Sequence, residues 1–110
     1  GLADLAYALN DAPHEIQFLK QALQWDPQHL HALISLGKAQ HAQGQYQQAR
    51  QSYNKALNQA PNNEKIYYLL GFTWERLDKK ERALSAFKKA LELKPDFEEA
   101  KSAIEKRQSP

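Results

Sequence analysis

Small and apolar residues recur along the chain at one fixed spacing, which we call the repeat period. An alanine-leucine pair appears three times and precedes a proline by the same interval each time: Ala22-Leu23 before Pro27, Ala56-Leu57 before Pro61, and Ala90-Leu91 before Pro95. The repeat period of about 34 residues is typical of units that cannot bury a core alone and become stable by stacking on their neighbours. The pattern therefore predicts a repeat array.

Within each period, the pattern predicts two helices that pack closely. Gly37 and Gly71 are small enough to let two helix axes approach, and Tyr53 and Phe87 are placed to fill the groove beside them. Each proline disfavours helical geometry in the residue before it, so the second helix of each pair is expected to end there. Asn62 and Asp96 follow two of these prolines, where we expect them to cap the next helix.

Seven helices are predicted, and no strand pattern competes with them. Turns are expected at 10–13, 43–45 and 77–79, where Gly, Asn and Asp tolerate the left-handed conformation that ends a helix. Pro13 suits the first turn of its helix. The expected helices cover residues 2–10, 13–25, 28–42, 45–59, 62–76, 79–92 and 97–107.

The best-formed unit resembles the tetratricopeptide repeat through Tyr67-x-x-Leu70-Gly71-x-x-Trp74, Ala83-x-x-x-Phe87-x-x-Ala90 and Pro95. The resemblance implies an all-α, right-handed α-solenoid of antiparallel helix pairs within one domain, 1–110. Residues 30–63 and 64–97 would be complete repeats, 1–29 a partial or degenerate repeat, and 98–110 a capping helix and tail. In the first complete repeat, Leu33 stands where the family often has Trp, and Gln40 where Tyr is usual.

Composition narrows the class of function. The chain has 110 residues, 42% of them hydrophobic and 25% charged, and its formal net charge is only +2. Basic and acidic residues are interspersed, so neither nucleic acid nor a membrane surface is an expected partner. The longest apolar stretch, 66–74, is too short to cross a bilayer, so no membrane insertion is expected.

Cysteine and methionine are both absent from the chain. There is no cysteine, which excludes a disulfide framework and a thiolate metal site but does not reveal the compartment; cytoplasmic is the default expectation. The chain starts inside a repeat and contains no methionine, which leaves open whether it is a piece of a longer protein.

The sequence contains no recognisable catalytic, cofactor or metal motif, and we expect no enzyme. His29 and His31 are two apart, so on a helix they point to different sides and cannot share a metal as an i, i+4 pair would. No serine belongs to a recognisable nucleophile motif, and no glycine-rich phosphate loop is present.

The resemblance also implies a concave groove lined by the first helix of each repeat. Carried onto this sequence, it gives Asp4, Tyr7, His31, Ile34, Lys38, His41, Lys65, Tyr68, Phe72 and Glu75, with Arg76 beside them. Tyr68 and Phe72 are apolar bulk beyond what the repeat needs for its own packing, which favours a binding surface for a peptide with apolar anchors and some acidic character. The alternative is that the final helix folds over this side and buries them.

Two further alternatives concern the partner. Family members that hold chaperone C-terminal carboxylates use a set of lysines and asparagines, whereas the matching positions here are Asp4, His31, Ser35, Lys38, Lys65 and Leu69, so that ligand is not expected. The leading hypothesis is a non-catalytic module that binds a protein or peptide. The competing one is an assembly unit whose N-terminal end, with Leu2, Leu5 and Leu9, stacks on further repeats or forms a homo-oligomer.

Overall fold

The structure, a computed structural model, describes residues 12–108, which form six helices and no strand. The helices are α2 (Ala12–Trp25), α3 (Leu30–Ala42), α4 (Tyr46–Gln59), α5 (Glu64–Arg76), α6 (Lys80–Leu93) and α7 (Glu98–Gln108). The predicted all-α fold is confirmed, and no end of these six helices differs from its predicted position by more than two residues. The predicted helix at 2–10, with Asp4 and Tyr7, lies outside the described residues.

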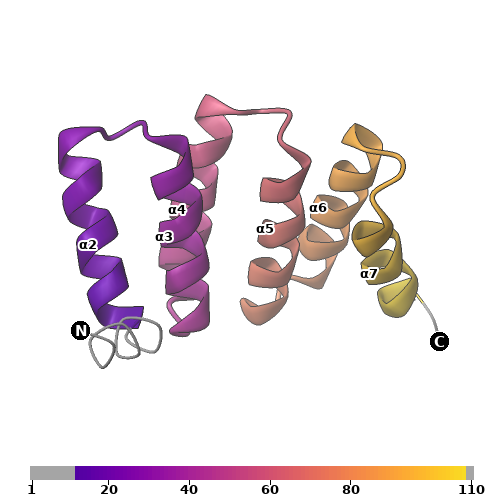
Figure 1. Ribbon diagram of the computed structural model, residues 1–110. Helices are drawn as coiled ribbons and strands as arrows, with labels where there is room; N and C mark the ends of the chain where they lie inside the picture. The colour runs from indigo at the N-terminus through magenta and orange to yellow at the C-terminus, as the bar shows by residue number, and fades with distance from the viewer. Residues whose placement is uncertain (1–11, 109–110) are drawn as a thin grey trace, which may run out of the picture.

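The helices form two layers in an elongated stack of 48 × 28 × 25 Å. In Figure 1, α4 and α6 lie behind α3 and α5, and the pairs follow one another from the indigo α2 to the yellow α7. One buried cluster joins the two complete helix pairs, α3–α4 and α5–α6. It contains Leu33 of α3, Tyr53 of α4, Leu70 of α5 and Ala86 of α6. The core is therefore shared between neighbouring pairs, as a stacked array requires.

Pro27, Pro61 and Pro95 each lie in a turn between two helices, and the hydrogen bonds of this turn correct the predicted N-caps. The N–H of Asn63 donates to the carbonyl of Ala60 at 3.1 Å, so Pro61 and Asn62 occupy the middle of a β-turn. Proline is favoured at the first of these two positions. The cap therefore falls one residue later than predicted: Asn63, not Asn62, accepts the N–H of Lys65 at 3.0 Å.

The N-termini of α3 and α7, which also follow a proline-containing turn, lie one repeat period before and after that of α5. His29 lies one repeat period before Asn63 and accepts the N–H of Ala32 through Nδ1 at 3.1 Å. Phe97 lies one period after Asn63 and directly precedes α7, so the prediction of Asp96 as the cap is also wrong by one residue. Phe97 is buried, so this position contributes packing to the last helix.

The predicted turns within the complete pairs are confirmed. Gly44 has φ +78° and Asp78 has φ +62°, the left-handed conformation expected after a helix end. The N–H of Gln45 donates to the carbonyl of Gln40 at 2.8 Å, and that of Lys79 to Trp74 at 2.9 Å, which satisfies carbonyls left over by the last helical turn.

Two glycines let an aromatic ring lie directly on a helix backbone. The Tyr53 ring lies on Gly37 and the Phe87 ring on Gly71, and both rings are fully buried. A Cβ built on Gly37 would lie 2.5 Å from Cε1 of Tyr53, well inside van der Waals contact. The helix pair can therefore close only where the first helix lacks a side chain.

Helix α7 packs against the preceding helix pair on one side and is exposed on the other. Ala100, Ala103 and Ile104 of α7 are buried against the neighbouring pair, and Glu105 is exposed. Glu98 and Glu99 occupy the first turn of α7, and Lys106 and Arg107 its last turn, an arrangement that suits the helix dipole.

The Gly71 contact predicts a sharp steric effect. We expect Gly71→Ala to lower the free energy of unfolding by about 1–3 kcal/mol, because the added methyl group overlaps the Phe87 ring. Combining it with Phe87→Leu should cost less than the sum of the two single changes, as measured by urea denaturation of all three variants. Additive losses would show that the ring does not set the helix separation.

Candidate functional site

The first helices of successive pairs, α3 and α5, together with α7, form what we call the inner face. The His41 ring nitrogen Nδ1 lies 2.9 Å from Oγ1 of Thr73 and so joins α3 to α5. Arg107 binds Glu75 and so joins α5 to α7. Glu75 lies one repeat period after His41, and Arg107 lies one repeat period after Thr73. The two contacts therefore join successive helices of the inner face at equivalent positions of the repeat.

Aromatic rings gather on the inner face where α5 meets α6 and α7. The Tyr68 ring lies 5.0 Å from Phe72, 5.9 Å from Phe87 and 5.0 Å from Phe97, measured between ring centroids. Tyr68 and Phe72 are half-buried and line an open depression of about 380 Å³ together with residues of α7, among them Ser102 and Lys106. The final helix therefore packs against both rings and still leaves part of their surface accessible.

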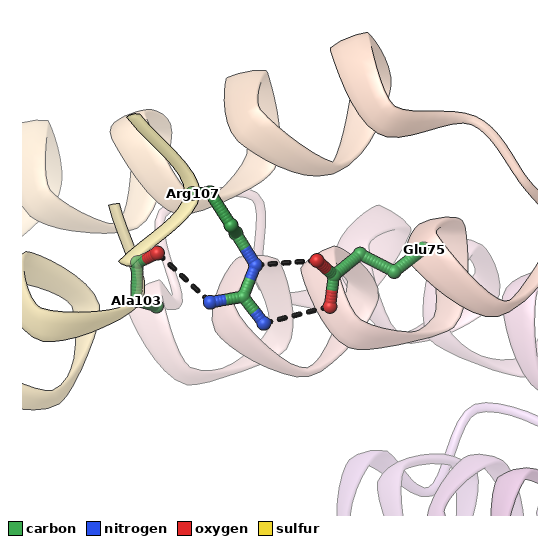
Figure 2. Close-up of polar contacts among 3 residues, drawn as sticks. All are labelled: Glu75, Ala103 and Arg107. Atoms are coloured by element: carbon green, nitrogen blue, oxygen red, sulfur yellow. Dashed lines mark hydrogen bonds and ion pairs between the residues drawn. The ribbon is translucent and has the colours of Figure 1, made fainter. Parts of the chain in front are cut away.

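Arg107, which lines this depression, forms an ion pair with Glu75 (Figure 2). Nε of Arg107 lies 2.5 Å from Oε2 of Glu75, and Nη2 lies 2.7 Å from Oε1, which is the two-pronged geometry that guanidinium and carboxylate groups favour. Nη1 donates to the carbonyl of Ala103 at 2.8 Å, and the guanidinium lies over the rings of Phe72 at 5.3 Å and Phe87 at 4.6 Å. The carboxylate of Glu75 is thus neutralised within the protein.

His41 occupies the corresponding joint between α3 and α5. Its half-buried ring meets Tyr46 edge-on at 5.0 Å, and the guanidinium of Arg76 lies over the same Tyr46 ring at 5.6 Å. Burial first, and then the positive charge of Arg76, lower the pKa of His41 from its usual value. The neutral imidazole is the form that this joint accommodates.

The remaining residues predicted for the groove divide into two groups. His31, Lys38, Lys65 and Arg76 are exposed, whereas Ile34 is half-buried and packs against the central core cluster. Helix α3 contains no acidic residue, so the exposed charges of this part of the inner face are basic. The structure thus places exposed basic residues on α3 and, adjacent to Glu64 and Glu75, on α5, beside the aromatic depression between α5 and α7.

Two exposed aromatic residues of α2 were not among the residues predicted from the sequence. Phe18 is 71% exposed and Trp25 is 91% exposed, and their spacing of seven residues puts them on one side of the helix. Phe18 lies one repeat period before Ser52 and two before Ala86, both of which are buried. Its place in the repeat could have identified Phe18, because the residues at the equivalent positions of the later repeats are buried.

The described part of the chain contains no group of three or more histidine, cysteine, aspartate or glutamate side chains close enough to hold a metal ion. Among these residues, no helix has the length and apolar character needed to cross a membrane.

The fold and its repeat period define an α-solenoid built from helix-pair repeats. The sequence profile of the tetratricopeptide repeat family matches residues 5–71, and a second profile of the same description matches residues 64–97. The chain belongs to the tetratricopeptide repeat family, as its repeated motif predicted. Repeats of this family are typically non-catalytic interaction modules, which supports a general role in protein interaction.

Solved structures share the fold at low sequence identity. MamA residues 41-end from Desulfovibrio magneticus RS-1 is 24% identical with a TM-score of 0.85, over 94% of this chain and 59% of that one. The Arabidopsis OM64 TPR domain is 25% identical with a TM-score of 0.85, over 96% and 87%. YrrB, described as a TPR protein with an unusual peptide-binding site, is 22% identical with a TM-score of 0.83, over 93% and 53%.

The chain spans little more than half the length of the first MamA structures that it matches, 58% and 54%. Among curated proteins, no relative matches the sequence.

The His41 joint predicts a pH dependence of stability. Because the folded state lowers the pKa of His41, it binds fewer protons than the unfolded state at pH values just below 6.5. The stability that depends on His41 is therefore present above 6.5 and is lost as the pH falls from there toward the folded-state pKa. We expect the melting temperature to fall between about pH 7.5 and 5, and to fall less in His41→Gln.

Gln is a suitable replacement because it can hydrogen-bond Thr73 without titrating. Equal losses of melting temperature in both proteins would show that other groups govern the acid response.

Proposed function

We propose that the protein is a non-catalytic interaction module whose inner face binds a peptide segment of a partner protein. The observation that carries this proposal is the pairing of Glu75 with Arg107, since it neutralises the acidic residue at the end of α5, while Glu98 and Glu99 lie on the α7 side of the depression, away from α3. Lys38 and Lys65 remain exposed on the neighbouring helices. A ligand with acidic residues therefore complements this part of the inner face.

The aromatic depression supplies the apolar half of the proposed site. Tyr68 and Phe72 are held by the rings of Phe87 and Phe97 yet keep accessible surface, so a ligand would meet a rigid apolar floor. Rigid aromatic anchors bind at a low cost in conformational entropy. We infer a ligand that places one apolar side chain between α5 and α7 and its acidic residues over α3 and α5.

The test reverses the charges of Lys38 and Lys65. We expect the purified wild-type domain to retain a partner from host lysate, and synthetic peptides then to identify the segment that binds. Lys38→Glu/Lys65→Glu should weaken binding of that peptide by about tenfold or more, measured by fluorescence anisotropy, because two attractions become repulsions. These side chains are exposed, so the variant should keep its fold.

Lys20→Glu/Lys88→Glu is the matched control, since it makes the same change of net charge at exposed positions on α2 and α6. A peptide that binds the inner-face variant and this control equally well would contradict the proposal.

A second candidate function rests on Phe18 and Trp25. We infer that this surface of α2 stacks on another copy of the chain or on further repeats, because burying two large aromatic side chains removes substantial apolar area from water. Sedimentation velocity should then show a mass that rises with concentration. Phe18→Gln/Trp25→Gln should remain monomeric at the same concentrations, and a wild-type chain that stays monomeric throughout would exclude self-association.

A further inference from the structure

The helices α2, α4 and α6 border two open depressions that occupy equivalent places in the repeat. The first lies between α2 and α4 and measures about 340 Å³, and the second lies between α4 and α6 and measures about 470 Å³. Most of the residues that line the α4–α6 depression follow a residue lining the first by one repeat period. The fold thus makes the same depression twice, and the sequence fills each one differently.

In the first depression, two polar side chains of the floor form a hydrogen bond with each other. Gln40 is buried, and its Oε1 accepts a hydrogen bond from Oγ of Ser52 at 2.6 Å. The equivalent positions of the α4–α6 depression hold Trp74 and Ala86, which cannot form that bond. Its floor is instead a half-buried indole beside Tyr67 and Leu57.

Two guanidinium groups lie against this indole. Cζ of Arg50, from α4, is 5.7 Å from the Trp74 ring centroid, and Cζ of Arg82, from α6, is 5.0 Å from it. Nε of Arg50 donates to Gln47 at 3.0 Å, and neither arginine forms an ion pair with any residue in the described range 12–108. A guanidinium that stacks on an aromatic face keeps its N–H edge available for a carboxylate.

The helices beside the depression are more basic than the chain as a whole. Helix α4 contains two basic residues and no acidic one, and α6 contains four basic residues and two acidic ones. The whole chain carries a net charge of only +2. The lining itself holds Arg82 and Glu81, whose charges balance, and Arg50, which lies over the Trp74 ring outside the lining, adds a second guanidinium at its edge.

We propose that the α4–α6 depression is a second binding site, which takes an acidic segment of a partner protein. Carboxylates of the segment pair with Arg82 and Arg50, and a neighbouring apolar side chain lies on Trp74 and Leu57. The volume suits one or two side chains of a peptide. This site is independent of the inner face, and either site can exist without the other.

The protein offers its own probe for a test. Trp25 and Trp74 are the two tryptophans of the chain, so Trp25→Phe leaves Trp74 as the sole source of indole emission. We expect a synthetic peptide with glutamates on both sides of a central leucine to change this emission in a saturable way. The same peptide with glutamines in place of glutamates should bind more weakly, and added salt should weaken binding of the glutamate peptide.

The binding variant and its controls separate this site from the inner face. In the Trp25→Phe background, Arg50→Gln/Arg82→Gln should weaken binding of the peptide by about tenfold, the effect of losing two partly exposed ion pairs. Lys38→Gln/Lys65→Gln should leave the titration unchanged. Trp74→Gln/Arg82→Gln/Ala86→Ser gives the α4–α6 depression the residues of the first one. In the Lys38→Gln/Lys65→Gln background, which removes the basic residues of the inner face, anisotropy of a labelled peptide should show that binding is lost.

Three outcomes would overturn the proposal: no saturable change of Trp74 emission, equal binding by the arginine variant, or loss of binding only in the lysine variant. Displacement of the peptide by a single-stranded oligonucleotide that binds more tightly would also overturn it, because the partner would then be a nucleic acid. Loss of binding only in the lysine variant would place the peptide on the inner face, and the other outcomes do not bear on the inner face.

Discussion

The contact between a glycine backbone and an aromatic ring sets the geometry of the whole stack. At Gly37 and at Gly71 the first helix has no side chain, so the ring of Tyr53 or Phe87 lies directly on it. This contact fixes how closely the two helices of a pair approach, and hence which residues of the pair remain for contact with the next pair. The bridges of the inner face, and the depressions beside α4, recur once per repeat period because the distance between the two helices of a pair recurs.

Much of the fold could be predicted because its local signals are short-range. Pro27, Pro61 and Pro95 and the turn residues Gly44 and Asp78 determine where helices end, and the helix ends agree closely with the structure. The caps were predicted one residue too early because the proline and the residue after it form the middle of a β-turn, which composition alone does not show. A rule that joined proline to its turn would have selected Asn63.

The candidate sites were harder to predict because they depend on how helices cross. Glu75 and Arg107 lie one repeat period after His41 and Thr73, so their positions follow from the register, but the contact between their side chains does not follow from spacing alone. The stacking of Arg50 and Arg82 on Trp74 likewise joins three different helices. The exposure of Phe18 could be predicted from its position in the repeat, whereas the exposure of Trp25 was seen only in the structure.

The two bridges of the inner face differ in strength, and this gives the array unequal stiffness along its length. Between α3 and α5 the bridge is one hydrogen bond between the half-buried His41 and Thr73, whereas between α5 and α7 it is a bidentate ion pair reinforced by two aromatic rings. When a load bends the solenoid, the joint at His41 should yield before the joint at Arg107. The C-terminal end then acts as a rigid anchor about which the preceding helices adjust their curvature.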